Sequence, residues 1–271
     1  MRSLGITAVI AAGAMTFIPF VAGAAENLRV GGTGAINEAV RGLAPAFAAE
    51  TGIAIQLVPS MGTSGGNSAL ADGVLDVSVS GRPLNAKEKA SGLKAVAEMR
   101  TPYGLVTSLA KPNALRSAEL AQLYQSDKPI WADGTPIRII LRPSNDSDTA
   151  LLGQLFPSMS EAIVKARSRA DLSVAATDQD NADMAEKMPG SLVGATLTQI
   201  KMEKRNLRFV AIDGVGPSLE SFENGSYPLG KSLYVVVGPN PNAAAISFVA
   251  FVRSPKGVAA LREAGLLLSV E

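Results

Sequence analysis

The sequence predicts an α/β fold in which helices cover both faces of parallel or mixed sheets. From about residue 25 onward, short apolar segments typical of strands alternate with amphipathic segments of helical spacing. This alternation is characteristic of parallel sheets covered by helices. The loops at the strand-to-helix junctions are rich in Gly, Ser and Thr, and 271 residues suffice for one large domain or two lobes.

The N-terminal segment has the features of an export signal. Arg2 is followed by an apolar run from Leu4 to Ala22, and Ala22-Gly23-Ala24 offers the small residues that signal peptidase requires. We therefore expect residues 1–24 to be a signal peptide cleaved near Ala24, and the mature protein to be periplasmic. An uncleaved membrane anchor is the alternative.

Composition and charge exclude several classes of function. Removing residues 1–24 removes one basic residue, Arg2, from 25 basic against 24 acidic, so the mature chain has no net charge. A neutral chain argues against binding to nucleic acid or to an anionic membrane. The chain has no cysteine and no histidine, which excludes disulfides, imidazole catalysis and most transition-metal sites. We expect no cofactor and no metal.

Each predicted strand is a short apolar or alternating run, bounded in most cases by turn-forming residues. In chain order the predicted strands are 28–30, 53–58, 76–80, 96–99, 104–110, 137–141, 174–177, 192–196, 208–212 and 233–238. The first helix places Ile36, Val40, Leu43 and Phe47 on one apolar face, and Thr51-Gly52 ends it. Further helices are predicted over 67–71, 120–124, 151–155, 248–252 and 258–262.

The most informative loop is Pro-Ser-Met-Gly-Thr-Ser-Gly-Gly, residues 59–66, between a strand and a short helix. The first N–H groups of a helix have no partner inside it, and their dipoles point outward together. Small side chains leave these groups accessible, so the loop predicts an anion site that includes Thr63, Ser64 and Gly65. A tight turn without a ligand is the alternative.

Two enzymatic or cofactor interpretations of these loops fail on composition. Ser64 stands at the centre of a Gly-x-Ser-x-Gly pattern, but without histidine a serine hydrolase has no imidazole base. Gly32-Thr-Gly34 starts like a dinucleotide fingerprint, but Asn37 replaces its third glycine and the second strand ends in Val58-Pro59 instead of an acid. We therefore expect a protein that is not an enzyme.

Taken together, the loops resemble those of the periplasmic phosphate-binding proteins that serve ABC importers. The resemblance covers most of the mature chain, and the order and spacing of its segments carry it. The matching segments are Gly32–Ala35, Gly62–Gly66, Asp76–Leu84, Ile130–Gly134, Arg142–Thr149, Ile212–Ser218 and Gly225–Leu229.

The resemblance implies a hinged, two-lobed fold of the type II class with the ligand in the cleft between the lobes. Lobe 1 would comprise residues 25–105 and 232–271, and lobe 2 residues 106–231. The chain would cross between the lobes near Tyr103–Ala110 and Tyr227–Val237. The implied ligand is inorganic phosphate or a related oxyanion, and the implied partner is an ABC permease of the inner membrane. The protein would be a monomer.

The resemblance also implies a set of ligand-binding residues. By motif match these are Thr33, Gly34, Ala35, Thr63, Ser64, Gly65, Arg82, Arg142, Ser147 and Thr149. Arg142 would supply the charge through its planar, bidentate guanidinium group. Thr63 and Ser64 would donate hydroxyl or amide hydrogen bonds.

Two departures from the family pattern concern the ligand. Gly81 stands where many relatives have an aspartate that accepts the proton of hydrogen phosphate. The arginine loop has one extra residue, and Asp148 replaces a glycine. Asp146 or Asp148 would cap the following helix. We expect Asp148 to compete with an anion for the amides at the helix start, so that its removal tightens phosphate binding. An alternative role for Asp148 is that of a relocated acceptor that selects hydrogen phosphate. The alternative functions for the chain are a sensor or scaffold with an altered or lost ligand and, more remotely, a serine hydrolase.

Overall fold

The computed structural model describes residues 27–34 and 37–269 of the chain. The predicted signal peptide over 1–24 and the predicted site residue Ala35 lie outside these residues, and both stay predictions. The strands are β1 Leu28–Gly32, β2 Ile55–Leu57, β3 Val77–Ser80, β4 Lys94–Thr107, β5 Arg138–Leu141, β6 Ser173–Val174, β7 Ser191–Thr196, β8 Arg208–Phe209, β9 Gly230–Val237 and β10 Leu267–Leu268.

Within the described residues the strands form one mixed sheet in the order β2-β1-β3-β9-β4-β7-β5-β6, with β8 and β10 both pairing with β4. β1 is parallel to β2 and β3, and β5 is parallel to β6 and β7. The long strands β4 and β9 are antiparallel to each other and to their outer neighbours. They join two parallel sheets into one.

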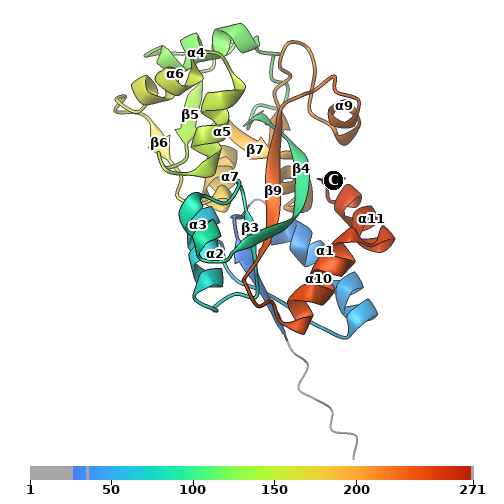
Figure 1. The fold of residues 1–271 in the computed structure, drawn as a ribbon. Coiled ribbons are helices and arrows are strands. Elements are labelled where there is room, and N and C mark those ends of the chain that lie inside the picture. The colour runs from blue at the N-terminus through green and yellow to red at the C-terminus, as the bar shows by residue number, and fades with distance from the viewer. Residues whose placement is uncertain (1–26, 35–36, 270–271) are drawn as a thin grey trace, which may run out of the picture.

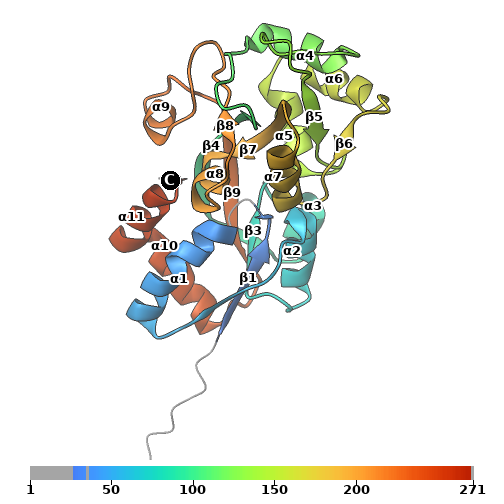
Figure 2. The same cartoon turned by 180° about the vertical axis from the view of Figure 1, so that it is seen from behind.

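The helices lie on both faces of this sheet, as Figures 1 and 2 show. They are α1 Asn37–Thr51, α2 Gly62–Ala71, α3 Ala86–Ala90, α4 Ser117–Gln125, α5 Ser147–Leu155, α6 Met159–Ala166, α7 Asp178–Lys187, α8 Leu197–Met202, α9 Leu219–Glu223, α10 Ala243–Arg253 and α11 Pro255–Glu263. α1, α10 and α11 cover one side of β1 and β3, and α2 and α3 cover the other. In the described part of the chain no single helix could span a membrane by length and composition, although α10 and α11, bent by 71°, together pass that test.

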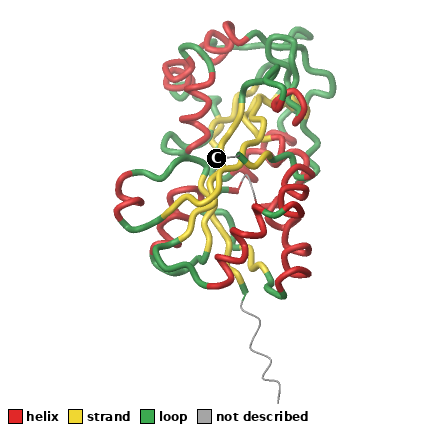
Figure 3. The backbone as a smooth tube through the Cα atoms, turned by 45° about the vertical axis from the view of Figure 1, so that its right-hand side comes forward, coloured by secondary structure: helices red, strands yellow, loops and turns green. Residues whose placement is uncertain are grey.

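The molecule is two-lobed, and the two largest of the four hydrophobic cores in the described residues lie in different lobes. The first core joins β1, α1 and β3 to the C-terminal helices, with Phe47 in edge contact with Phe248 and Phe251 at 5.5 Å between ring centroids. The second core lies between α4, α5, α6 and β5 and extends from Leu105 to Ile212. Figure 3 shows the strands running through the middle of both lobes with the helices outside.

The predicted α/β, two-lobed class is therefore confirmed. The lobes are connected where β4 stops pairing with β9, at Pro102–Gly230, and begins to pair with β7, at Tyr103–Thr196. Proline has no N–H to donate to a ladder, so Pro102 suits this change of partner. The exact lobe boundaries, 105/106 and 231/232, stay predictions.

Two predicted elements differ from the structure. The segments 96–99 and 104–110 are one strand, β4, and the helix predicted to begin at residue 67 begins five residues earlier, at Gly62. The early start is possible because α2 packs directly on β1. A Cβ on Gly66 would lie 2.5 Å from the Cα of Gly32, and a Cβ on Gly32 would lie 2.2 Å from the carbonyl oxygen of Val79. Only glycine allows this approach.

Candidate anion-binding site

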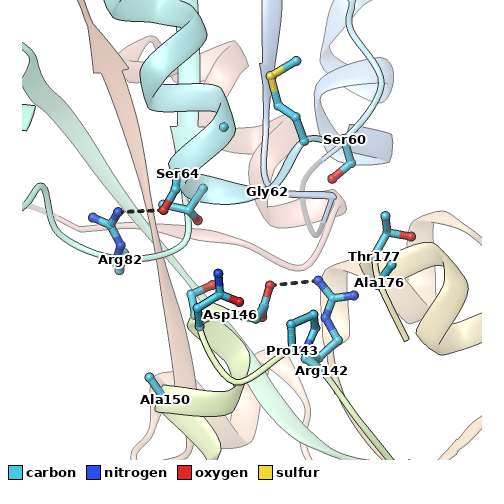
Figure 4. Close-up of a pocket in the computed structure, with 15 residues that line it drawn as sticks. Ser60, Gly62, Ser64, Arg82, Arg142, Pro143, Asp146, Ala150, Ala176 and Thr177 are labelled. Carbon is cyan, nitrogen blue, oxygen red and sulfur yellow. Dashed lines mark hydrogen bonds and ion pairs between the residues drawn. The ribbon is translucent and has the colours of Figure 1, made fainter. Parts of the chain in front are cut away.

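A cavity of about 410 Å³ opens between the start of α2 and the start of α5, one from each lobe (Figure 4). It is lined by Ser60, Met61, Gly62, Thr63, Ser64, Gly65, Arg82, Arg142, Pro143, Asn145, Asp146, Ser147, Ala150, Ala176 and Thr177. Six of the predicted site residues are therefore brought together: Thr63, Ser64, Gly65, Arg82, Arg142 and Ser147.

The lobe-1 wall is the N-terminus of α2. Its N-cap residue, Met61, makes no side-chain cap, so the first N–H groups of this helix have no side-chain acceptor there. Thr63 is buried, and its hydroxyl accepts a hydrogen bond of 2.8 Å from the backbone N–H of Gly81. Ser64 also lines the cavity and is exposed.

Arg82 stands at the rim between Ser64 and an acidic partner. Its guanidinium contacts the Ser64 hydroxyl at 3.2 Å and forms two hydrogen bonds with Glu88, at 2.8 and 2.9 Å. These bonds to Arg82 are the main reason why the pKa of Glu88 is lowered to about 2. The positive charge of Arg82 is therefore largely balanced at this position.

The lobe-2 wall is built around Arg142, which follows β5. Its side chain is 8% exposed, and it donates hydrogen bonds to the carbonyl oxygen of Ala175 at 3.3 Å and to Asp146 at 2.9 Å. Asp178 lies 3.9 Å away. The Nε atom of Arg142 is buried and has no hydrogen-bond partner among the residues that the structure describes. Figure 4 shows Arg142 and Asp146 next to each other at the lower edge of the cavity. Arg142 thus lines the cavity with a guanidinium group whose hydrogen-bonding capacity is not fully used within the described residues.

The two aspartates of the arginine loop have different roles. Asp146 is the N-cap of α5, and its carboxylate accepts the N–H of Asp148 at 2.8 Å. Asp148 lies in the first turn, as predicted, but it is buried, does not line the cavity and forms an ion pair with the buried Lys231. The expectation that Asp148 competes with an anion for amides is therefore wrong, because its carboxylate is bound to Lys231.

Burial also changes the protonation of this pair, which we call the floor pair. Removal from water, together with the nearby charges of Asp178 and Asp146, raises the pKa of Asp148 to about 6, against the opposing effect of Lys231. Burial lowers the pKa of Lys231, but Asp148 and Asp178 outweigh that effect and raise it above its ordinary value. The helix dipole does not keep Asp148 as acidic as expected from its position in the first turn.

Three other predicted residues, Thr33, Gly34 and Thr149, lie outside the cavity lining. Thr33 is buried beside Asp178 of α7, with 3.4 Å between its hydroxyl and the carboxylate. The carbonyl oxygen of Gly34 accepts a hydrogen bond of 3.1 Å from Gln179. The Thr149 hydroxyl donates to the carbonyl oxygens of Arg142 and Pro143. Thr33 and Gly34 thus connect lobe 1 to α7, and Thr149 orders the arginine loop.

Sequence reasoning missed Lys231, Asp178 and Thr177. The sequence does contain a signal for the burial of Lys231. Alternate residues of a strand share one face, and Lys231 lies on the same face of β9 as Leu233 and Val235, which are both buried. Asp178 and Thr177 begin a helix that was not predicted. The capping box of Thr177 and Asp180 is the sequence signal that marks its start.

The fold and the cavity together define a two-lobed α/β binding protein, and comparison with known proteins agrees. The sequence profile of the PBP superfamily domain matches residues 20–256, so the chain belongs to this family. The family resemblance seen in the loops is confirmed. No curated protein matches the sequence.

Among solved structures, one similar protein is a Clostridium perfringens protein assigned as a phosphate ABC transporter substrate-binding protein and solved with bound phosphate. It has 17% identity, covers 90% of this chain and 100% of its own, and has a TM-score of 0.76. An ABC-type phosphate transport receptor from Vibrio cholerae has 14% identity and a TM-score of 0.62, with 90% and 100% covered. The periplasmic molybdate-binding protein of Azotobacter vinelandii has 15% identity and a TM-score of 0.60, with the same coverage. Because the sequence identities are only 14–17%, these structural similarities show a shared fold and nothing more.

Proposed function

We propose that this protein is a periplasmic solute-binding protein that captures a small tetrahedral oxyanion, phosphate first, and delivers it to an ABC permease. The ligand would be held between the uncapped start of α2 and Arg142, with Thr63, Ser64 and Ser147 as hydroxyl donors. The protein would be exported through cleavage near Ala24 and act as a monomer. It would bind its ligand without transforming it.

The observation that carries this proposal is the position of Arg142. The Arg142 side chain is 8% exposed, and its buried Nε has no hydrogen-bond partner in the described part of the chain. It lies across the cavity from the N-terminus of α2, a helix of ten residues. The helix supplies N–H groups and a partial positive charge, and the arginine supplies a full one. Both favour an anion.

A second observation favours an altered ligand over phosphate. Arg142 is already paired with Asp146 and lies near Asp178, so its charge is partly compensated before any ligand arrives. A site with a partly compensated charge suits a receptor that binds phosphate weakly, or one that binds a different oxyanion. The similarity to a molybdate-binding protein makes molybdate a reasonable second ligand to test.

Calorimetric titration of the mature protein, unfolded and refolded to remove any bound ligand, tests the proposal. The probes are phosphate, sulfate and molybdate. We expect saturable binding of at least one anion, and a loss of about 2–5 kcal/mol of its binding free energy in Arg142→Ala, the range for a buried charge pair that loses one partner. Arg142→Lys should also weaken binding, because an ammonium group cannot reproduce the planar fork.

Arg116→Ala is the matched control, since the side chain of Arg116 is 76% exposed and lies outside the cavity. It should bind like the wild type. Equal affinity of Arg142→Ala and the wild type would show that the proposed site is wrong. If none of the three anions binds, the remaining hypothesis is a sensor or scaffold that has lost its ligand.

A further inference from the structure

At the floor of the cavity lies a largely buried cluster of charges, of which the proposed site uses only Arg142 to hold the ligand. Two cations, Arg142 and Lys231, share it with three carboxylates, Asp146, Asp148 and Asp178. When all five are ionised, the cluster carries one net negative charge next to a cavity proposed to take an anion. Such an arrangement opposes the ligand unless the cluster gains a proton.

The floor pair is the place where that proton can be held. Gly81 lies between the floor pair and the residues that line the cavity. A Cβ on Gly81 would lie 3.2 Å from Cε of Lys231 on one side. It would also lie 2.9 Å from the Ser147 hydroxyl and 3.2 Å from the Thr63 hydroxyl. Ser147 and Thr63 line the cavity, so Lys231 and its partner Asp148 are adjacent to the ligand position without touching it.

Titratable or charged groups from several elements act on Asp148. Lys231 comes from β9, Asp178 from the start of α7 and Tyr103 from β4. Asp146 and Arg142 belong to the loop before α5. Lys231 is the one direct ionic partner that the described residues give Asp148. Burial and the two other carboxylates already bring its pKa to about 6.

We propose that the Asp148–Lys231 pair makes anion binding proton-linked, so that the protein takes up a proton at Asp148 when an oxyanion enters the cleft. An incoming dianion adds negative charge beside the cluster and thereby favours the neutral form of Asp148. By linkage, protonation of Asp148 strengthens anion binding by the same factor. The affinity of the protein for its anion would therefore fall as the pH rises. The inference rests on the proposed function.

The test uses molybdate and sulfate, two dianions that do not themselves gain a proton between pH 6 and 8. Calorimetry in two buffers of different ionisation enthalpy measures proton uptake. We expect the wild type to take up about one proton per anion near pH 7, and its affinity to fall toward tenfold for each pH unit above 6. Phosphate is measured in parallel. Because phosphate itself titrates near pH 7, only the difference in pH dependence between the wild type and the variants is used.

Asp148→Asn removes the titrating group and keeps a side chain that fits beside Lys231. Its anion affinity should no longer change with pH, its proton uptake should vanish, and at pH 8 it should bind at least about tenfold more tightly than the wild type. Asp133→Asn, in an exposed turn outside the cavity, is the matched control and should keep the wild-type slope.

The outcomes separate the two proposals. If no anion binds to the wild type, the proposed function fails and this inference with it. If an anion binds without proton uptake, or if Asp148→Asn keeps the pH slope, only the inference is overturned. Should Asp148→Asn not fold, carbon NMR of the wild type decides. The Asp148 carboxyl must titrate at higher pH with bound anion than without it, and an unchanged titration overturns the inference.

Discussion

Lys231 and Asp148 form a buried ion pair although 83 residues separate them in the chain. Lys231 lies at the start of β9, where this strand crosses between the lobes, and Asp148 lies in the first turn of α5. The pair therefore attaches a helix of lobe 2 to the strand that connects both lobes. This ion pair therefore links the two elements at the floor of the cleft before any ligand is bound.

The floor pair should contribute to stability in a pH-dependent way. Lys231→Met leaves Asp148 buried without its cation, which typically costs about 3–5 kcal/mol of unfolding free energy when the remaining group is charged. The pKa of Asp148, already raised to about 6, would rise further. A raised carboxyl pKa favours the folded state at low pH and loses that advantage as pH rises through the folded value. Denaturant unfolding should therefore show a large loss at pH 8 and a smaller one at pH 5.

Lys165→Met serves as the control for this prediction, because Lys165 is exposed on α6. It should unfold like the wild type at both pH values. A loss in Lys231→Met that is the same at pH 5 and pH 8 would contradict the assignment of the effect to Asp148.

Gly81 should be intolerant of a side chain. The Cβ of Gly81→Ala would crowd the hydroxyls of Ser147 and Thr63 and the Lys231 side chain. Overpacking of this kind costs about 1–3 kcal/mol of stability, and displaced hydroxyls should weaken anion binding. Thermal unfolding and calorimetric titration measure the two effects. Gly216→Ala is the control, since nothing lies within 4 Å of its Cβ position. Identical behaviour of the two variants would refute the close packing at Gly81.

Glu88 should stabilise the fold only above acidic pH. Its pKa is lowered from 4.5 to about 2, chiefly by the hydrogen bonds from Arg82. A lowered carboxyl pKa contributes stability that is complete above pH 4.5 and is lost as pH falls toward 2. Glu88→Gln should therefore lower the free energy of unfolding by about 1 kcal/mol near pH 7, which is the upper end of the range for a partly exposed ion pair. The loss should become progressively smaller below pH 4.5.

Glu119→Gln is the control for Glu88, because the side chain of Glu119 is 61% exposed and its nearest guanidinium nitrogen is 3.5 Å away. Urea unfolding of both variants from pH 7 to pH 2.5 makes the comparison. A difference between Glu88→Gln and the wild type that persists undiminished at pH 2.5 would show that the ion pair is not its source.

Export should produce a mature chain that begins at Ala25. The prediction follows from the apolar run and the small residues Ala22 and Ala24 before the cleavage point. Mass spectrometry of protein recovered from the periplasm measures the N-terminus. Ala24→Leu places a large residue where signal peptidase needs a small one and should block cleavage. Exported protein that retains Met1 would contradict the prediction.

Much of the fold could be predicted from the sequence because its cores follow simple periodicities. The first helix was expected from the spacing of Val40, Leu43 and Phe47, and all three are buried in the first core. α7 was not predicted, because its buried apolar face consists only of the small residues Ala182 and Ala185. A helix stabilised by its capping box and by packing of alanines has little hydrophobic periodicity.

The candidate site could be predicted only where a local motif contributes to it. The Gly-rich loop and the arginine loop each carry their own signal, and both line the cavity. The Lys231–Asp148 pair depends on how α5 packs against β9, and no local pattern determines that contact. The contact between Thr33 and Asp178 has the same origin, since 145 residues separate its members.

The path of the chain through the two cores has a consequence for the order of folding. The second core is complete once Ile212 has been synthesised, because all its buried residues lie between Leu105 and Ile212. The first core requires Leu233, Phe248 and Leu266 as well as Leu28. Contacts between such distant segments form slowly, because the loop between their ends must close first. We therefore expect the first core to form after the second, because it needs segments as distant as Leu28 and Leu266 to meet.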